Sequence, residues 1–495
     1  MRIRVVGAGV MGRGIAQWAA VAGHTVELAD ARRESVTEAC AFVAGMLERA
    51  VAKGRMSEAE AAETRGRLHE LDSPYAAPCA EGAPELVIEA VREDLETKAE
   101  LFTGLEKVLP AATVFATNTS SLAVTELGAR LADPSRLAGL HFFNPVPLMK
   151  IAEVVPGAAT RADVPGMLRE FVEGCGHRAV TVADTPGFLV NHAGRGLVTE
   201  ALALLEEQAA EPVDIDRVAR DVLGLRMGPF ELMDLTGLDV TASVIETVWR
   251  GFHHSDRLRP SYLTANRVTA GLLGRKTGRG WYAYDAEGKQ QVPPEEALGG
   301  DAGRAVTVAG QGAELQEFLD ALGVPRGSAG DDALVLVPTW GDTVAGAVAE
   351  HGLPPERTVG VDPLSLGTAR TVLAVTPATG QDARRDAAAV LARGGSAVTV
   401  VRDTAGSVAQ RLLSSVVSVS ASIAERGIAT PADIDLAVKA GLGYPYGPLE
   451  WAEHIGTARL LTLQRTLHAT TGDPRHRPTR WLTERVQLGL PLTAG

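Results

Sequence analysis

The chain has 495 residues, enough for about three or four domains of ordinary size. Its formal net charge of -13 at pH 7 argues against nucleic acid as a partner. Cys40, Cys79 and Cys175 lie far apart, without the spacing of a disulfide framework or a metal site, which predicts no bound metal and a reducing compartment. No apolar run is long enough for a bilayer, and the first strand pattern begins without a leader segment, so we expect a soluble, cytoplasmic protein.

The first pattern along the chain is a strand, a glycine turn and a helix, with the sequence GAGVMG at residues 7–12. In a dinucleotide site, each of these glycines is required for a physical reason. Gly7 permits the tight turn, Gly9 lets the backbone approach the pyrophosphate, and Gly12 lets the helix pack on the strand. A strand before this turn and a helix after it are the context in which such a motif predicts nucleotide binding.

Three more residues extend the predicted cofactor site. Val10 and Met11 open the helix, whose N-terminus offers free N–H groups to the pyrophosphate. Asp30 ends a second apolar run eighteen residues after Gly12, where an acid accepts hydrogen bonds from the ribose hydroxyls. Because a carboxylate repels a 2′-phosphate, Asp30 favours NAD over NADP.

Up to about residue 182, short apolar runs alternate with helical patterns, which predicts an α/β fold with a doubly wound sheet. The runs are Val5-Val6, Thr25–Leu28, Leu86–Ala90, Thr113–Ala116, Leu137–Phe143, Ile151–Val155 and Ala179–Val182. A charged, alanine-rich stretch at 34–71 predicts a helical hairpin that stands off the sheet. From residue 184, helical patterns replace the strands and predict a separate all-α domain.

The second half of the chain repeats the first at a constant offset of 219. The segment 184–187 (DTPG) matches 403–406 (DTAG), and 228–231 (GPFE) matches 447–450 (GPLE). The strand and glycine turn recur at 305–312 with the larger offset of 303, so the second copy is shorter than the first, and Leu315 replaces the third glycine. We therefore predict a nucleotide-binding Rossmann-type domain at 1–183, a helical substrate and dimerisation-type domain at 184–285, a degenerate, ligand-free Rossmann-like remnant at 286–402, and a second helical domain at 403–495.

A nucleotide site implies hydride transfer, and hydride transfer from an alcohol needs a base. His141 ends a predicted strand, the edge at which open α/β sheets bind ligands, and Glu153 lies in the next strand. A carboxylate beside an imidazole fixes its tautomer and stabilises the imidazolium. From spacing alone, a core histidine and an exposed strand glutamate are an equally good interpretation. Asn118 and Ser120 follow another strand at the same edge, and by themselves they indicate only a polar loop or cap.

Five segments, taken together and in order, identify a family. They are 7–12 (GAGVMG), 89–95 (EAVREDL), 118–122 (NTSSL), 139–145 (GLHFFNP) and 184–188 (DTPGF). On these segments the chain resembles the (S)-3-hydroxyacyl-CoA dehydrogenase family over residues 1 to about 285. Its tandem second half is similar to that of long bacterial members of the 3-hydroxybutyryl-CoA and 3-hydroxyadipyl-CoA type. The resemblance implies NAD as the cofactor and helical domains like that of 6-phosphogluconate dehydrogenase.

The resemblance also implies roles for single residues. His141 would remove the proton of the 3-hydroxyl group as hydride leaves C3 for the nicotinamide, with Glu153 paired to it. Ser120 and Asn191 would bind near the reacting oxygen and the thioester carbonyl, where neutral donors stabilise negative charge. Further contacts with NAD are implied for Glu93, Lys98, Asn118, Asn144 and Lys276. Contacts with the CoA substrate are implied for Ser120 and for Lys53 of the hairpin.

Some positions depart from the family pattern. Where the family commonly has Arg after Asn191, this chain has His192, so we expect the acyl end of the pocket to differ. In the second copy, Gln410 stands at the Asn191 position and Asp362 near the His141 position. We therefore expect the second half to be catalytically silent.

The function predicted from the sequence is NAD-dependent oxidation of (S)-3-hydroxyacyl-CoA to 3-oxoacyl-CoA, or the reverse, a reaction of β-oxidation. Two alternatives stay open: a dehydrogenase of a non-CoA 3-hydroxy acid or a carrier-bound 3-hydroxyacyl group, and a non-catalytic NAD-binding structural protein. The expected partners are a small-molecule acyl-CoA and a second copy of the chain in a homodimer, with no nucleic acid or membrane. Within the chain, the helical domains are expected to pair through small residues, namely Gly194, Gly196, Ser414, Ser415 and Ser418.

Overall fold

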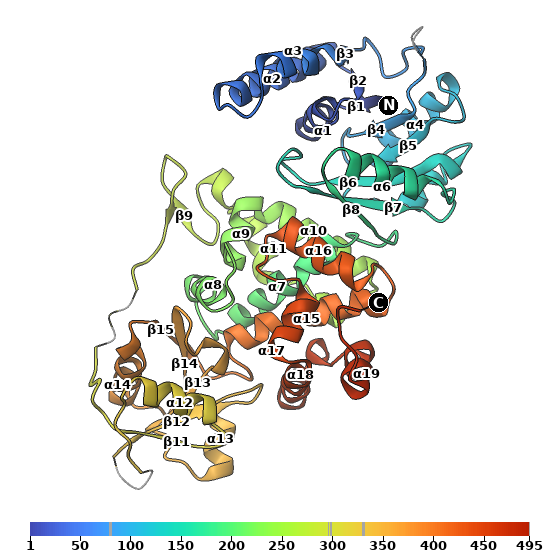
Figure 1. Cartoon of the computed structure of the whole chain (residues 1–495). Coiled ribbons are helices and arrows are strands. Elements are labelled where there is room, and N and C mark those ends of the chain that lie inside the picture. The colour runs from blue at the N-terminus through green and yellow to red at the C-terminus, as the bar shows by residue number, and fades with distance from the viewer. Residues whose placement is uncertain (79–81, 296, 298, 329–331, 495) are drawn as a thin grey trace. The chain divides into compact units, whose positions relative to one another are not determined.

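The computed structural model describes residues 1–78, 82–295, 297, 299–328 and 332–494 (Figure 1). Cys79 lies outside the described residues. Contacts divide the chain into two compact units: Met1–Asn191 with Arg426–Leu442, and His192–Glu425 with Gly443–Gly495. Among the described residues, no helix combines the length and the apolar character that a membrane crossing requires.

An eight-stranded sheet forms the centre of the first unit, in the order β3-β2-β1-β4-β5-β6-β7-β8. Neighbouring strands are parallel, except that β6 and β7 are antiparallel. The strands are β1 Arg2–Val6, β2 Thr25–Ala29, β3 Leu68–Glu70, β4 Leu86–Glu89, β5 Val114–Thr117, β6 Leu137–Phe142, β7 Ile151–Pro156 and β8 Arg178–Thr181. Strand order reverses between β1 and β4, so ligands are expected beyond the carboxyl ends of these strands.

Helices cover both faces of this sheet because successive strand residues point to opposite sides. Val114 and Ala116 of β5 belong to the core beneath α1, α2 and α6, whereas Phe115 between them packs against Phe102 of α4, with ring centroids 5.3 Å apart. The helices of the first unit are α1 Val10–Val21, α2 Arg33–Ala52, α3 Glu58–Gly66, α4 Leu95–Val108, α5 Val124–Gly128, α6 Val164–Gly174 and α16 Pro431–Leu442, with a 3₁₀ turn η1 at Pro134–Arg136.

Helices α2 and α3 lie side by side at the β3 end of the sheet (Figure 1). A capping box between Ser57 and Glu60 starts α3, and a small apolar core of Val43, Leu47 and Ala61 joins the two helices. The segment Leu68–Glu70, expected in the hairpin, forms the edge strand β3 instead. Its three residues are too few and too polar to produce a strand pattern.

The second unit contains a helical part and a five-stranded sheet in the order β11-β12-β13-β14-β15, in which β13 and β14 are antiparallel. Helix α7, Val190–Glu206, begins at the boundary of the two units. The other helices are α8 Pro212–Asp221, α9 Pro229–Thr236, α10 Leu238–Gly251, α11 Tyr262–Thr269, α12 Ala313–Ala321, α13 Val344–His351, α14 Gln381–Leu391, α15 Val408–Glu425, α17 Pro448–Ile455, α18 Thr457–Thr471 and α19 Arg480–Leu488. The 3₁₀ turns are η2 Asp256–Leu258, η3 Arg275–Thr277, η4 Pro363–Ser365, η5 Ala392–Gly394 and η6 Pro474–His476. The strands of the five-stranded sheet are β11 Val306–Val308, β12 Leu334–Pro338, β13 Thr358–Val361, β14 Arg370–Val375 and β15 Ala397–Arg402. Strands β9 Ala283–Tyr284 and β10 Gln290–Gln291 pair with each other outside this sheet.

The duplication is visible in the element bounds. Strands β7 and β14, and helices α9 and α17, coincide residue for residue at the offset of 219. Strand β11 and helix α12 correspond instead to β1 and α1, at the offset of 303. Among the described residues, the second half has no counterparts of α2, α3, β3, β4 and α4, and an isolated parallel bridge between Val306 and Arg326 lies near the place of the β1–β2 pairing. The second-half sheet has kept the strands equivalent to β1 and to β5–β8.

The two copies contact each other at reciprocal positions, the arrangement of an interface with two-fold symmetry. In the first unit, the N–H of Ala183 donates to the carbonyl of Ile428 at 2.8 Å. The counterparts of these residues are Arg402 and Ala209, and in the second unit the N–H of Arg402 donates to the carbonyl of Ala209 at 2.9 Å. Corresponding residues of the two copies therefore form the same backbone hydrogen bond twice, once in each unit.

Helices α7 and α15 approach closely where a glycine faces its own counterpart. A Cβ atom on Gly196 would lie 2.9 Å from the carbonyl oxygen of Ser415, so a side chain at this position would force the helices apart. Beside this contact, Arg411 of α15 donates to Glu200 of α7 and to Glu207, just after α7. The side chains of Arg411 and Glu200 are each 1% exposed, so a pair of opposite charges lies inside the helical core.

The charges around Glu200 compensate for its burial. Burial alone raises the pKa of this carboxyl group, but Arg411, His476 and Arg475 outweigh burial and lower the pKa to about 2. Loss of one partner of a buried ion pair is costly, and without Arg411 the buried Glu200 would keep the longer contact with Arg475, at 3.3 Å.

Replacing Arg411 by Met should therefore lower the free energy of unfolding by about 3–5 kcal/mol, measured by urea titration. The matched control is Arg480→Met, which removes an exposed pair with Glu484 on α19 and should cost about 0.5 kcal/mol or less. Equal losses for the two variants would contradict a structural role for the buried pair.

Candidate active site

The glycine turn after β1 has the geometry of a dinucleotide site. Gly7 has a φ of +105°, and a Cβ atom there would lie 2.4 Å from the carbonyl oxygen of Ala90. A Cβ atom on Gly12 would lie 1.7 Å from the carbonyl oxygen of Gly7, so the fold itself requires both glycines. Gly9 is different: no heavy atom lies within 4 Å of the position of its Cβ atom. Open space at Gly9, next to the exposed Val10, fits a bound pyrophosphate.

Asp30 links this turn to the end of β2. Its Oδ2 atom accepts a hydrogen bond from the N–H of Ala8 at 2.8 Å, and its Oδ1 atom accepts one from the N–H of Arg32 at 3.0 Å. These bonds fix the carboxylate at the carboxyl ends of β1 and β2. Each carboxylate oxygen can accept a second hydrogen bond, so the predicted ribose contact is compatible with this position.

His141 and Glu153 face each other across β6 and β7. The antiparallel register pairs the two residues directly, and His141 Nδ1 lies 2.6 Å from Glu153 Oε2. Glu153 is completely buried, and its Oε1 atom accepts from the N–H groups of Leu189 and Val190 at 3.0 and 2.8 Å. The alternative interpretation, an exposed strand glutamate, is therefore wrong.

This arrangement leaves one imidazole nitrogen for chemistry. A carboxylate only accepts hydrogen bonds, so His141 donates its Nδ1–H to Glu153 and carries its lone pair on Nε2. The rings of Phe143 and Phe188 pack against the imidazole, with centroids 4.6 and 5.8 Å away. Together these contacts fix both the tautomer and the orientation of the ring, as a general base requires.

The polar run after β5 lies at the same sheet edge. The Oδ1 atom of Asn118 accepts from the N–H of Phe142, next to His141, at 2.9 Å. Ser120, two residues after Asn118, is exposed. The structure thus brings the 118–121 loop and His141 together at the carboxyl ends of β5 and β6.

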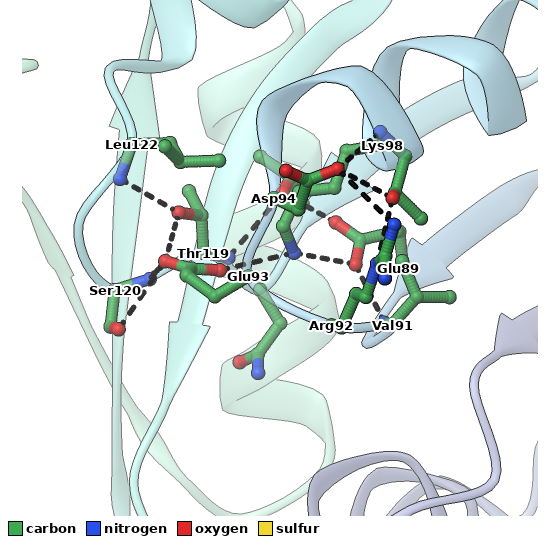
Figure 2. A network of polar contacts seen from close by, with 12 residues as sticks. Glu89, Val91, Arg92, Glu93, Asp94, Lys98, Thr119, Ser120 and Leu122 are labelled. Carbon is green, nitrogen blue, oxygen red and sulfur yellow. Dashed lines mark hydrogen bonds and ion pairs between the residues drawn. The ribbon is translucent and has the colours of Figure 1, made fainter.

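Glu93 also binds this loop (Figure 2). Its Oε1 atom accepts from the N–H groups of Ser120 and Ser121 at 2.8 and 2.9 Å and from the hydroxyl of Thr119 at 2.6 Å. Lys98 of α4 lies 3.2 Å from Oε2. Burial raises the pKa of Glu93, but Lys98 and these hydrogen bonds outweigh it and lower the pKa to about 2.

Lys98 is itself buried, with 1% of its side chain exposed (Figure 2). Its Nζ atom lies 2.6 Å from Glu89, which is also buried and accepts from the hydroxyl of Thr117 at 2.6 Å. Burial raises the pKa of Glu89, and the charge of Lys98 opposes this effect. Lys98 can therefore influence a bound ligand through its ion pair with Glu93. A direct contact between Lys98 and NAD stays a prediction.

The other predicted site residues lie outside this network. Asn144 is exposed after β6, Asn191 lies in the first turn of α7, and Lys53 is exposed at the end of α2. Lys276 belongs to the second unit, where its Nζ atom lies 2.6 Å from Asp239. Their roles remain predictions from the family resemblance.

Near the second-half positions that correspond to His141 and Glu153, buried polar side chains bind one another. Asp362, near the His141 position, is 1% exposed, and its Oδ1 atom accepts from Gln410, the counterpart of Asn191, at 2.8 Å. The hydroxyl of Ser407 donates to the other oxygen of Asp362. These buried polar groups satisfy each other, and the catalytic silence of the second half stays a prediction.

Comparison with protein families identifies both halves of the chain. The NAD-binding domain of 3-hydroxyacyl-CoA dehydrogenase matches residues 2–185. The C-terminal domain of 3-hydroxyacyl-CoA dehydrogenase matches residues 187–284 and again residues 406–493, and the two matches are related by the offset of the internal repeat. The chain belongs to the 3-hydroxyacyl-CoA dehydrogenase family.

Relatives agree with this assignment. The chain is 36% identical over 488 residues to 3-hydroxyadipyl-CoA dehydrogenase of Escherichia coli (strain K12), and the match covers 98% of this chain and 97% of that protein. It is 38% identical to a probable 3-hydroxybutyryl-CoA dehydrogenase of Bacillus subtilis (strain 168), over 57% of this chain and 97% of that protein. A crystal structure of 3-hydroxybutyryl-CoA dehydrogenase from Escherichia coli K12 matches with a TM-score of 0.85 and 35% identity, over 99% of this chain and 98% of that one.

Several predictions made from the sequence are thereby confirmed. They are the family, the Rossmann-type fold with helical C-terminal domains, the oxidoreductase class and NAD as the cofactor of the N-terminal domain. The four domain boundaries and the roles of single site residues stay predictions. The family resemblance implied a contact between Glu93 and NAD. The hydrogen bonds between Glu93 and the 118–121 loop were not predicted, because the two segments are distant along the chain.

Replacing Glu93 by Gln tests this hold. A carboxyl group whose pKa is lowered on folding stabilises the folded state above its unfolded pKa and loses that effect as the pH falls through its folded pKa. The free-energy deficit of the variant relative to wild type should be constant near neutral pH and shrink between pH 4.5 and about 2. Urea titrations over this pH range measure the deficit; a deficit that grows on acidification would contradict the assignment.

Proposed function

We propose that the chain interconverts (S)-3-hydroxyacyl-CoA and 3-oxoacyl-CoA with NAD, at one active site in its first half. The observation that carries this proposal is the 2.6 Å contact between His141 and the buried Glu153, at the same sheet edge as the dinucleotide turn. Membership of the 3-hydroxyacyl-CoA dehydrogenase family supports the reaction class.

His141 acts as the general base in the direction of oxidation. Its Nε2 atom takes the proton of the 3-hydroxyl group as the C3–H bond breaks and the C3–O bond becomes a carbonyl. NAD, when bound, accepts the hydride. Glu153, which lies 2.6 Å from Nδ1, stabilises the imidazolium that results. In the reverse direction, His141 returns the proton to the oxygen on C3.

Two neutral side chains complete the proposed site. Ser120 lies in the loop that Glu93 holds, and Asn191 follows Val190, whose N–H binds Glu153. Uncharged donors at these positions can stabilise partial negative charge on the reacting oxygen or the thioester carbonyl. The backbone of Ser120 binds Glu93, whereas the segment that leads to Asn191 binds Glu153, the carboxylate that also contacts His141.

The cofactor and substrate contacts are proposed from the positions described above. Gly7, Gly9, Val10, Met11 and Gly12 would hold the pyrophosphate, and Asp30 the ribose. Full-length and half-length relatives are named for 3-hydroxyadipyl-CoA and 3-hydroxybutyryl-CoA, so we propose a short 3-hydroxyacyl-CoA as the substrate.

The location and assembly of the protein complete the proposal. Cys40 and Cys175 are free thiols, which suits the reducing cytoplasm. Half-length relatives match only 57% of this chain. We propose that the reciprocal contacts between the two helical copies replace, within one chain, a contact that such shorter proteins make between subunits.

Replacing His141 by Gln should lower kcat roughly 10²–10⁴-fold, because the proton then has no base. Binding of NADH, followed by its fluorescence, should stay within twofold of wild type. The matched control is His24→Gln, a histidine just after α1 that lies away from β6. Unchanged turnover by the His141 variant, assayed with acetoacetyl-CoA and NADH, would refute the assignment of the base.

A panel of 3-oxo substrates separates the alternatives. We expect oxidation of NADH with 3-oxoacyl-CoA esters, and comparison of kcat/KM between butyryl and adipyl tails would identify the acyl group. Lys53→Ala should raise KM for a CoA ester and leave KM for a free 3-oxo acid unchanged, with the exposed Lys107→Ala as control. If Lys53→Ala affects both substrates equally, Lys53 does not contact CoA. If no substrate of the panel oxidises NADH, the protein is not the proposed dehydrogenase.

A further inference from the structure

One helix of the second half belongs to the compact unit that contains the catalytic pair. Residues 426–442 join Met1–Asn191 in the first unit, and their helix α16 packs on β7 and β8. The backbone bond between Ala183 and Ile428 attaches this segment directly after β8. Strand β7 carries Glu153, so α16 lies against the strand that holds the catalytic carboxylate.

Gly441, in the last turn of α16, contacts the backbone segment that binds Glu153. A Cβ atom on Gly441 would lie 3.0 and 3.1 Å from the two γ carbons of Val190. The N–H of Val190 donates to Glu153, which in turn binds His141. A continuous chain of contacts therefore leads from Gly441 to the general base.

The duplication shows that a helix in this position can carry a side chain. The counterpart of Gly441 is Val222, at the end of α8, and the counterpart of Val190 is Ala409. At one place the large residue is Val222 and the small one is Ala409. At the other place the small residue is Gly441 and the large one is Val190. Cores tolerate such exchanges when the total volume is kept. The absence of a side chain at 441 is thus matched to Val190 and is not a requirement of the helix.

We propose that Gly441 is a positioning residue for the reaction, and that through it the second half of the chain keeps the residues of the first-half site in their positions. α16 packs against the Leu189–Val190 segment and keeps it next to β7. There the N–H groups of Leu189 and Val190 bind one oxygen of Glu153, and the other oxygen binds His141. This inference rests on the proposed function, because it concerns the same base.

Gly441→Ala in the full-length enzyme tests the proposal. The new methyl group must displace Val190 by a few tenths of an ångström, and a shift of Glu153 misplaces the imidazole. We expect kcat to fall about tenfold, since misplacement of this kind has large effects on rate. KM for both substrates should stay within twofold. The primary isotope effect with deuterated NADH should rise, because hydride transfer becomes slower.

Val190→Ala/Gly441→Ala is the rescue variant. It removes the γ carbons that the new methyl group meets and keeps the N–H that binds Glu153, so at least half of the lost kcat should return. The matched control is Gly166→Ala in α6, where nothing lies within 4 Å of the new Cβ atom. Its kcat should equal that of wild type. If Gly441→Ala does not fold, Val190→Ala alone should lower kcat and the double variant should restore it.

The outcomes separate this inference from the proposed function. An inactive wild-type enzyme would refute the proposed function. An active wild type with unchanged kcat and isotope effect in Gly441→Ala would refute the positioning role alone. So would a loss of kcat that the double variant does not recover, because the contact with Val190 would then not be its cause.

Discussion

The completely buried carboxylate of Glu153 is the constraint on which the first half of this enzyme depends. A charge without access to water must be hydrogen-bonded on both oxygens, or it becomes neutral. One oxygen binds His141, and the other binds the first N–H groups of the segment that leads into α7. These bonds fix the register of β6 and β7 and the entry of α7. The hydrogen bonds that satisfy this buried carboxyl group are the same ones that orient the imidazole of His141.

Charged groups organise the rest of the site in the same way. Lys98 lies between Glu89 and Glu93, and Glu93 carries the loop of Ser120 (Figure 2). Each carboxylate in this network accepts from backbone or hydroxyl donors as well as from the lysine, so the loop is held by several directed bonds at once. Directed bonds of this kind fix a position more closely than apolar packing alone. A rigid loop suits the role proposed for Ser120, because a preorganised neutral donor stabilises charge that develops during a reaction.

The sequence predicted local features well and distant contacts poorly. The glycine turn could be recognised because its geometry depends on residues within one turn and one helix. His141 and Glu153 could be matched because neighbouring strands place them opposite each other, but the sequence could not tell whether Glu153 is buried. The donors that settle this question, Leu189 and Val190, lie far along the chain. For the same reason the hold of Glu93 on its loop and the contact of Gly441 with Val190 gave no signal in the sequence.

The pair of Glu200 and Arg411 shows a consequence of having both copies in one chain. In a symmetric homodimer every substitution appears on both sides of the axis, so a new charge always arrives twice. Here the counterparts of Glu200 and Arg411 are Val419 and His192, and the acid and the base face each other only once. Joining the two copies in one chain allowed each half to change independently. That freedom explains how one copy could lose much of its nucleotide-binding fold and still be retained as the permanent partner of the other.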